Sequence, residues 1–395
     1  MTPFDAFLPT RFLFGPGRLE ALGTTPYLPG KRALVVIGSR GAMVSSGYLQ
    51  RVEELLCRNG VNAAVFDRID PNPDSQQIED GADVFRSNGC DFALGLGGGS
   101  SLDAAKSIAF MAANTGRYWD YMVRGSGGRR KPEHPAFPIV AIPTTAGTGS
   151  EADPWTVVSK SGGNEKAGWG HDSTFPCLSI IDPELTLTLP PTQTAYTGLD
   201  ALLHAVEAVL SRAAQPFSDL LALDAIARIR RHLPGAVHRG DDITCRCAMS
   251  MAALEAGVCE ALTGVISLHA MGLALGGLFP GIAHGAALVS LAPAYFEFLE
   301  SGVPDRFRRL AKAMADGERQ SRGGETGFTI RLEQLITESG LAGTRLRAFG
   351  VSTDDVPALV ENTFQCAGAH FKRTPLDMSA DDVERIFRCA LDEAV

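Results

Sequence analysis

The sequence lacks any long uninterrupted apolar run, although 45% of its 395 residues are hydrophobic. A transmembrane helix needs about 20 consecutive apolar residues, so we expect no membrane partner. The N-terminal segment MTPFDAFLPTRFLFG has no positively charged leader followed by an apolar stretch. Because that combination marks secretion, we expect a cytoplasmic protein.

The chain is also short of positive charge and of paired cysteines. It has 36 Lys and Arg against 45 Asp and Glu, which gives a net charge of -9. A nucleic-acid surface needs clustered Lys and Arg, so we expect no nucleic-acid partner. The eight cysteines form no C-x-x-C pair, which argues against a structural zinc site and a disulfide framework.

Short β-branched runs alternate with helical patterns in the first part of the chain, as is typical of a parallel α/β sheet. The predicted strands are 32–37, 62–66, 91–96 and 138–142, and a further pair at 157–158 and 178–181 closes the domain. After Pro190-Pro191 the strand signals disappear and helical patterns take over. We therefore expect an α/β plus all-α protein, with a parallel-sheet domain over 1–185 and an all-helical domain over 186–395.

A glycine run follows the third predicted strand. Gly97, Gly98 and Gly99 precede a helix predicted from Ala104. Without a Cβ atom they let backbone N–H groups approach an anion at a helix N-terminus, which suits a pyrophosphate. The spacing is not G-x-G-x-x-G, and a plain strand-to-helix turn is the alternative. The small residues and hydroxyls of 143–151 end the next strand, where open α/β sheets bind ligands.

In the helical part, Asp200 and His204 lie four residues apart in the apolar segment TGLDALLHAV. At helical pitch they share one face. A hydrogen-bonded core pair is one interpretation, because burying the two groups unpaired would be costly. Two more histidines offer another: His269, in a helix predicted to run over 241–277, and His284.

On one continuous helix, His269 and His284 would be about 22 Å apart. Pro280-Gly281 breaks the helix between them, so both imidazoles can reach one point. Either histidine taken singly is more often a core residue than a ligand. Taken with Asp200 and His204 they make one carboxylate and three imidazoles, a set suited to ferrous iron or zinc.

Four segments in this order resemble the iron-containing (group III) alcohol dehydrogenase family. They are GGGSSLDAAKSIA at 97–109, PTTAGTGSEADP at 143–154, GLDALLHAVEA at 198–208, and the spaced His269 and His284. The resemblance covers essentially the whole chain. It implies a dinucleotide-binding α/β domain, a helical metal-binding and substrate domain, and catalysis in the cleft between them.

The resemblance also implies residue roles. The implied metal ligands and catalytic residues are Asp200, His204, His269 and His284. The implied cofactor contacts are Gly97, Gly98, Gly99, Ser100, the nearby Asp103, and on the nicotinamide side Thr144, Thr145 and Thr148. The implied reaction moves a hydride between NAD(P) and a small to medium alcohol or aldehyde. The implied metal is Fe(II), with Zn or another divalent ion as the alternative, and the implied assembly is a homodimer.

Two positions near the third ligand depart from the family pattern. Leu273 stands four residues after His269, where many members carry a histidine that faces the substrate, and Phe279 stands ten residues after it. An apolar lining there favours an aliphatic substrate over a strongly anionic one and lacks the proton-relay histidine. His171 is a candidate replacement relay, and a surface-loop histidine is the alternative.

The first strand ends in Gly38-Ser39-Arg40, which we expect to contact the cofactor. Members that prefer NAD often have a carboxylate there, which accepts hydrogen bonds from the ribose hydroxyls. Without it a 2′-phosphate is not repelled, and Arg40 could pair with that phosphate. We therefore expect NADP to be slightly favoured over NAD.

Two other function classes stay open. A dehydroquinate synthase-like lyase shares the architecture and uses NAD and a metal without net redox, but such enzymes usually have Glu at the position of Asp200. They also carry more basic residues for a phosphorylated substrate. A binding protein that kept the fold without catalysis has no need of four intact ligand positions. The residues favour the oxidoreductase.

Overall fold

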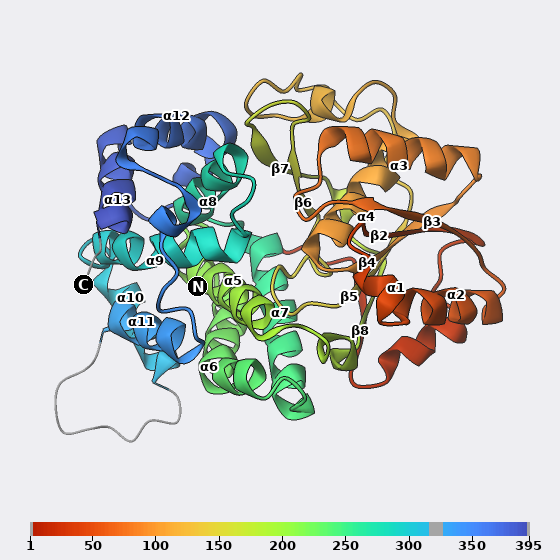
Figure 1. The fold of residues 1–395 in the computed structure, drawn as a ribbon, viewed down its shortest axis with the longest axis horizontal. Helices are drawn as coiled ribbons and strands as arrows, with labels where there is room; N and C mark the ends of the chain where they lie inside the picture. The colour runs from red at the N-terminus through yellow and green to blue at the C-terminus, as the bar shows by residue number, and fades with distance from the viewer. Residues whose placement is uncertain (1–2, 316–326, 393–395) are drawn as a thin grey trace. The chain divides into compact units, whose positions relative to one another are not determined.

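The computed structural model describes residues 3–315 and 327–392 (Figure 1). It divides into two compact units. One spans Phe7–Thr188, and the other runs from Leu189 onward and includes the N-terminal segment up to Ala6. The division falls shortly after the boundary predicted between residues 185 and 186.

The first unit is built on a six-stranded parallel sheet in the order β1-β8-β5-β4-β2-β3. Its strands are β1 (Arg11–Phe14), β2 (Arg32–Gly38), β3 (Asn62–Ile69), β4 (Phe92–Gly97), β5 (Ile139–Pro143) and β8 (Leu178–Ile181). The predicted strands are confirmed, including 178–181 as β8 and 157–158 within β6. A separate antiparallel pair consists of β6 (Trp155–Ser159) and β7 (Lys166–Gly170).

Helices cover both faces of the sheet, as a buried parallel sheet requires. They are α1 (Ala42–Ser45), α2 (Tyr48–Arg58), α3 (Ser75–Ser87) and α4 (Gly99–Ala113). Alternate side chains of β2 point to opposite faces of the sheet. Leu34 and Val36 pack with α3 and α4, whereas Val35 and Ile37 pack with α2. The near-continuous apolar run of β2 therefore reflects burial on both sides.

The second unit is helical in its described part. Its helices are α5 (Pro191–Leu210), α6 (Pro216–His238), α7 (Ile243–Thr263), α8 (Ser267–Leu278), α9 (His284–Glu300), α10 (Pro304–Met314), α11 (Phe328–Glu338), α12 (Val356–Ala367) and α13 (Ala380–Asp392). Every residue of α5 from Gly198 to Leu210 is buried. Polar side chains on that stretch consequently lie inside the unit.

The continuous helix predicted over 241–277 is wrong. The chain forms two helices there, α7 and α8, which are bent by 102°. Gly264 follows α7 with φ +61°, a conformation that glycine adopts readily and that ends the helix. A Cβ atom on Gly264 would meet the Arg373 guanidinium at 2.5 Å. The break matters because it places His269 in the first turn of α8.

The break predicted at Pro280-Gly281 is confirmed, since α8 ends at Leu278 and α9 begins at His284. Among the described residues no single helix has the length and apolar composition to span a membrane. Only the bent pair of α7 and α8 meets that criterion when the two helices are taken together.

Candidate metal centre and cofactor-binding turn

Three of the four predicted metal ligands converge in the helical unit. The ligand atoms of Asp200, His269 and His284 all lie within 4.8 Å of one another. Asp200 Oδ1 is 3.5 Å from His269 Nε2 and 3.7 Å from His284 Nε2. Two atoms that each bind one ion at about 2.1 Å are at most about 4.2 Å apart. Both separations fit two ligands of a single ion.

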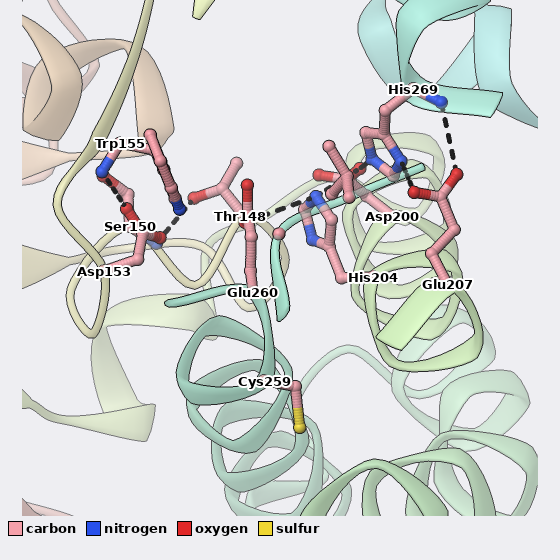
Figure 2. Close-up of polar contacts among 12 residues, drawn as sticks. Thr148, Ser150, Asp153, Trp155, Asp200, His204, Glu207, Cys259, Glu260 and His269 are labelled. Carbon is pink, nitrogen blue, oxygen red and sulfur yellow. Dashed lines mark hydrogen bonds and ion pairs between the residues drawn. The ribbon is translucent and has the colours of Figure 1, made fainter. Parts of the chain in front are cut away.

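His204 lies at the edge of this group. Its Nε2 is 3.9 Å from Asp200 Oδ1. Its ring stacks on that of His269, with centroids 4.4 Å apart and planes at 16° (Figure 2). The same Nε2 is 3.7 Å from Oε2 of Glu260, a residue that the sequence had not singled out. The structure therefore brings all four predicted ligands together, with His204 also facing a second carboxylate.

The residues present fit a metal ion. Asp200 and His269 are each only 4% exposed. Asp200 Oδ1 and His269 Nε2 make no hydrogen bond within the described ranges. Leaving such buried atoms unsatisfied costs about 1–3 kcal/mol each. A divalent cation satisfies both, because carboxylate oxygen and neutral imidazole nitrogen are among its usual ligands.

The electrostatics of the group agree with a cation at its centre. Burial lowers the pKa of His269, but the carboxylates of Glu207 and Asp200 outweigh burial and raise that pKa to about 10. Burial raises the pKa of Asp200, yet the facing histidines, His204 foremost, hold it well below its ordinary value. The carboxylates around His269 thus create an environment that favours positive charge at this point.

Glu207 is a further polar residue of this centre that was missed from the sequence. It lies on α5 one turn after His204 and is completely buried. Its Oε2 is 3.0 Å from His269 Nδ1 (Figure 2). A carboxylate at Nδ1 keeps the proton on that nitrogen and leaves Nε2 free to act as a ligand. The available signal was a charged residue in an apolar segment, three positions after His204.

Glu207 also explains where α8 begins. The first N–H groups of a helix have no partner inside the helix. Glu207 Oε2 accepts the N–H of Ile266 at 2.6 Å, and its Oε1 accepts that of His269 at 3.2 Å. Thr374 Oγ1 accepts the N–H of Ser267 at 3.1 Å. One carboxylate on α5, the helix of Asp200 and His204, thus holds the helix that carries His269.

Leu273 and Phe279, the two residues that stand in place of the relay histidine, are apolar. Leu273 is buried on α8, one turn beyond His269, and Phe279 caps the end of that helix. His171 lies in the other unit and caps a short turn, where its Nδ1 accepts the N–H of Ser173 at 3.1 Å. This contact gives His171 a local structural role.

The predicted cofactor segments lie side by side in the α/β unit. The Thr144 N–H donates to the Gly97 carbonyl at 2.8 Å, across the ends of β5 and β4. A Cβ atom on Gly98 would meet Thr145 at 3.2 Å, and one on Gly99 would meet Thr148 at 2.6 Å. The turn therefore needs glycine for packing as well as for access to its N–H groups. Helix α4 starts at Gly99, earlier than predicted, because glycine weakens the helical signal.

Two predicted cofactor residues make contacts within the protein. Ser100 Oγ donates to the Pro71 carbonyl at 2.5 Å. The two carboxylate oxygens of Asp103 accept the Ser150 hydroxyl at 2.7 Å and the Val157 N–H at 2.9 Å. Asp103 thus ties the loop after β5 to α4, and its direct contact with a cofactor stays a prediction.

The end of β2 has a carboxylate beside it that comes from the neighbouring strand. Gly38 is the last residue of β2, and Ser39 and Arg40 are exposed. Ser39 Oγ donates to Asp70 Oδ1 at 2.7 Å, and Asp70 directly follows β3. Gln77 Nε2 donates to the other oxygen of Asp70 at 2.9 Å. Asp70 therefore supplies a carboxylate at this edge of the sheet, although β2 itself has none.

Both units match one protein family along nearly their whole length. Residues 9–183 match the family described as iron-containing alcohol dehydrogenase, and residues 194–391 match the C-terminal part of the Fe-containing alcohol dehydrogenase family. The chain belongs to the iron-containing alcohol dehydrogenase family. The fold class and the oxidoreductase function are thereby confirmed, and the lyase alternative is not supported.

Three similar proteins are each about one-third identical to this chain. The NAD-dependent methanol dehydrogenase of Bacillus methanolicus is 32% identical over 99% of this chain and 100% of its own length. The choline dehydrogenase of Bacillus subtilis is 33% identical over 79% of this chain and 77% of its own. The solved structure of the archaeal Red Sea brine pool alcohol dehydrogenase ADH/D1 is 31% identical, with a TM-score of 0.92 over 99% of this chain and 100% of that one.

Proposed function

We propose that this alcohol dehydrogenase moves a hydride between a nicotinamide dinucleotide and a small to medium alcohol or aldehyde, with a divalent metal at Asp200. The observation that carries the proposal is the convergence of His269 and His284 on the buried Asp200 Oδ1. The names of the Bacillus relatives, methanol and choline dehydrogenase, support a short alcohol as substrate.

Asp200, His269 and His284, together with His204, would hold the metal, with Fe(II) favoured and Zn or another divalent ion as the alternative. When bound, such an ion supplies a Lewis acid that polarises a carbonyl oxygen or acidifies an alcohol. The protein's own residues prepare the site. Glu207 keeps the proton of His269 on Nδ1, and the burial of Asp200 excludes water from its ligand oxygen.

The glycine turn at the start of α4 would bind the pyrophosphate through backbone N–H groups. The β2 and β3 ends would receive the adenosine ribose. We propose a small preference for NADP, because Arg40 can pair with a 2′-phosphate. Asp70 keeps that preference small, since its carboxylate beside Ser39 repels the same phosphate.

A homodimer and a cytoplasmic location complete the proposal. The family resemblance supports the dimer, and the eight cysteines, all free in the structure, support a reducing compartment such as the cytoplasm. Light scattering of the purified protein measures the first, and fractionation of the source cells measures the second.

The test uses protein purified without oxygen, with metal analysis and absorbance at 340 nm over a panel of short alcohols and aldehydes with each cofactor. Asp200→Asn should lose bound metal and turnover together, whereas Asp354→Asn, an exposed control, should lose neither. Full turnover by metal-stripped protein would overturn the metal role. An absence of hydride transfer with every member of the panel would overturn the substrate class.

A further inference from the structure

Glu260 is a carboxylate beside the metal centre that none of the recognised motifs includes. It lies in the last turn of α7, four residues before Gly264. Its side chain is only 14% exposed, and its Oε2 is 3.7 Å from His204 Nε2. In Figure 2 it extends from α7 toward the imidazole of His204.

The backbone holds Glu260 in this place. Its carbonyl accepts the N–H of Gly264 at 2.8 Å, which closes the last turn of α7. Gly264 then turns the chain into α8 with a positive φ. Helix α7 also packs against α5, the helix that carries Asp200 and His204. Glu260 is therefore presented to the centre by a helix end of defined geometry, unlike a carboxylate on a surface loop.

The distance from Glu260 to His204 suits two ligands of one ion. Asp200 Oδ1 is 3.5 Å from His269 Nε2, 3.7 Å from His284 Nε2 and 3.9 Å from His204 Nε2. The separation of Glu260 Oε2 from His204 Nε2, at 3.7 Å, falls in the same range. All four values lie below the limit of about 4.2 Å for two ligands of one ion. Glu260 thus meets, toward His204, the criterion that the predicted ligands meet toward Asp200.

The charge balance of the metal centre also favours Glu260 as a ligand. Neutral imidazoles leave the two positive charges of the ion intact, and Asp200 offsets only one of them by direct contact. The oxygens of Glu207 face His269 and Ile266. A largely buried carboxylate is stabilised next to a cation, since the attraction grows as water is excluded. Glu260 can offset the second charge.

We propose that Glu260 is an additional oxygen ligand of the metal centre, bound on the side of His204. The inference rests on the metal centre of the proposed function. With Glu260 the protein offers five ligand atoms, which leaves one position of an octahedral ion open. Ions that accept six ligands, such as Mn²⁺ and Fe²⁺, then gain more from Glu260 than Zn²⁺, which usually takes four.

The experiment loads the metal-stripped full chain with Mn²⁺, Zn²⁺ or Co²⁺. Dissociation constants for Mn²⁺ and Zn²⁺ come from competition with a chelator, and the visible absorption of Co²⁺ reports its coordination number. The variants are Glu260→Gln and Glu260→Asp, which keeps the carboxylate. The matched control is Glu255→Gln on the same helix, because burial raises the pKa of Glu255 to about 8 and leaves it largely neutral at pH 7.

For Glu260→Gln we expect the affinity for Mn²⁺ to fall about tenfold or more. Removing a group that only supports a metal ligand already causes a loss of this size, and a ligand should cost at least as much. We expect a smaller loss of affinity for Zn²⁺. The Co²⁺ absorption should become more intense, because fewer ligands surround the ion. Glu260→Asp should lie between Glu260→Gln and the wild type, and Glu255→Gln should match the wild type.

Unchanged Mn²⁺ affinity and an unchanged Co²⁺ spectrum in Glu260→Gln would overturn the inference. Equal losses for Mn²⁺ and Zn²⁺, accompanied by lower thermal stability of the metal-free variant, would overturn it too, because they indicate a structural role. If Asp200→Asn binds metal as the wild type does, the metal centre itself is wrong. That result separates failure of the proposed function from failure of the role given to Glu260.

Discussion

Replacing Glu207 with glutamine tests whether this buried carboxylate positions His269. The two oxygens of Glu207 receive three contacts, from the Ile266 N–H at 2.6 Å, the His269 N–H at 3.2 Å and His269 Nδ1 at 3.0 Å. Glutamine keeps the shape and one oxygen, but its other group is an NH₂ that only donates. In Glu207→Gln at least one donor therefore faces another donor.

The expected effect has two parts. A buried N–H left without an acceptor costs about 1–3 kcal/mol, so the free energy of unfolding of the metal-free protein should fall by that amount. Loss of the outer partner of a ligating imidazole lowers metal affinity roughly 10–100-fold. That loss corresponds to about 1.4–2.7 kcal/mol of binding free energy.

The two parts are measured separately. Competition against a chromophoric chelator gives the metal dissociation constant, and urea unfolding of the metal-free protein gives the free energy of unfolding. Glu297→Gln is the matched control, since Glu297 is exposed on α9 and should change neither quantity. Metal affinity at the wild-type value in Glu207→Gln, together with reduced stability, would show that Glu207 only caps α8. That outcome would refute its positioning role.

Three further predictions concern other parts of the chain. Gly99→Ala places a Cβ atom 2.6 Å from the Thr148 methyl, so the KM for the dinucleotide should rise about tenfold because the turn is overpacked. Adding Thr148→Ser to the same chain removes that methyl and should restore the KM. Failure of this rescue would contradict the packing role. Burial raises the pKa of Glu255 from an ordinary value of 4.5 to about 8 in the folded protein. Its contribution to stability is therefore full below pH 4.5 and is lost as pH rises through 8. Glu255→Gln should remove that part of the pH dependence of the Tm between pH 5 and 8.5, and an unchanged slope would count against it. Asp70→Asn should raise the ratio of kcat/KM for NADPH to kcat/KM for NADH by roughly tenfold, because it removes a negative charge beside the proposed ribose site. An unchanged ratio would place Asp70 away from the 2′ position of the cofactor.

The limits of sequence-based prediction are clearest at α7 and α8. The buried strands were predictable because their β-branched runs are short and end in glycine or proline turns. The break after α7 was not, because Gly264 stands alone inside an apolar helical pattern, where a single glycine is also tolerated. Only the packed structure shows that Gly264 has a positive φ and that α8 starts a new direction.

At the candidate site the sequence by itself determined the chemical types of the ligands. Asp200 and His204 share a helix face because of their spacing, and His284 could converge on them because proline and glycine end the preceding helix. These features depend on local backbone geometry, which a short segment specifies. The two-part architecture follows from local patterns in the same way.

Tertiary structure decided which other groups reach those ligands. Glu207 meets His269, and Glu260 meets His204, across pairs of helices, and Asp70 meets Ser39 across two strands. Such contacts depend on how the elements pack, because residues far apart in the chain meet only through that packing. The sequence determined that a metal centre and a dinucleotide turn could form, and packing decided the carboxylates that surround them.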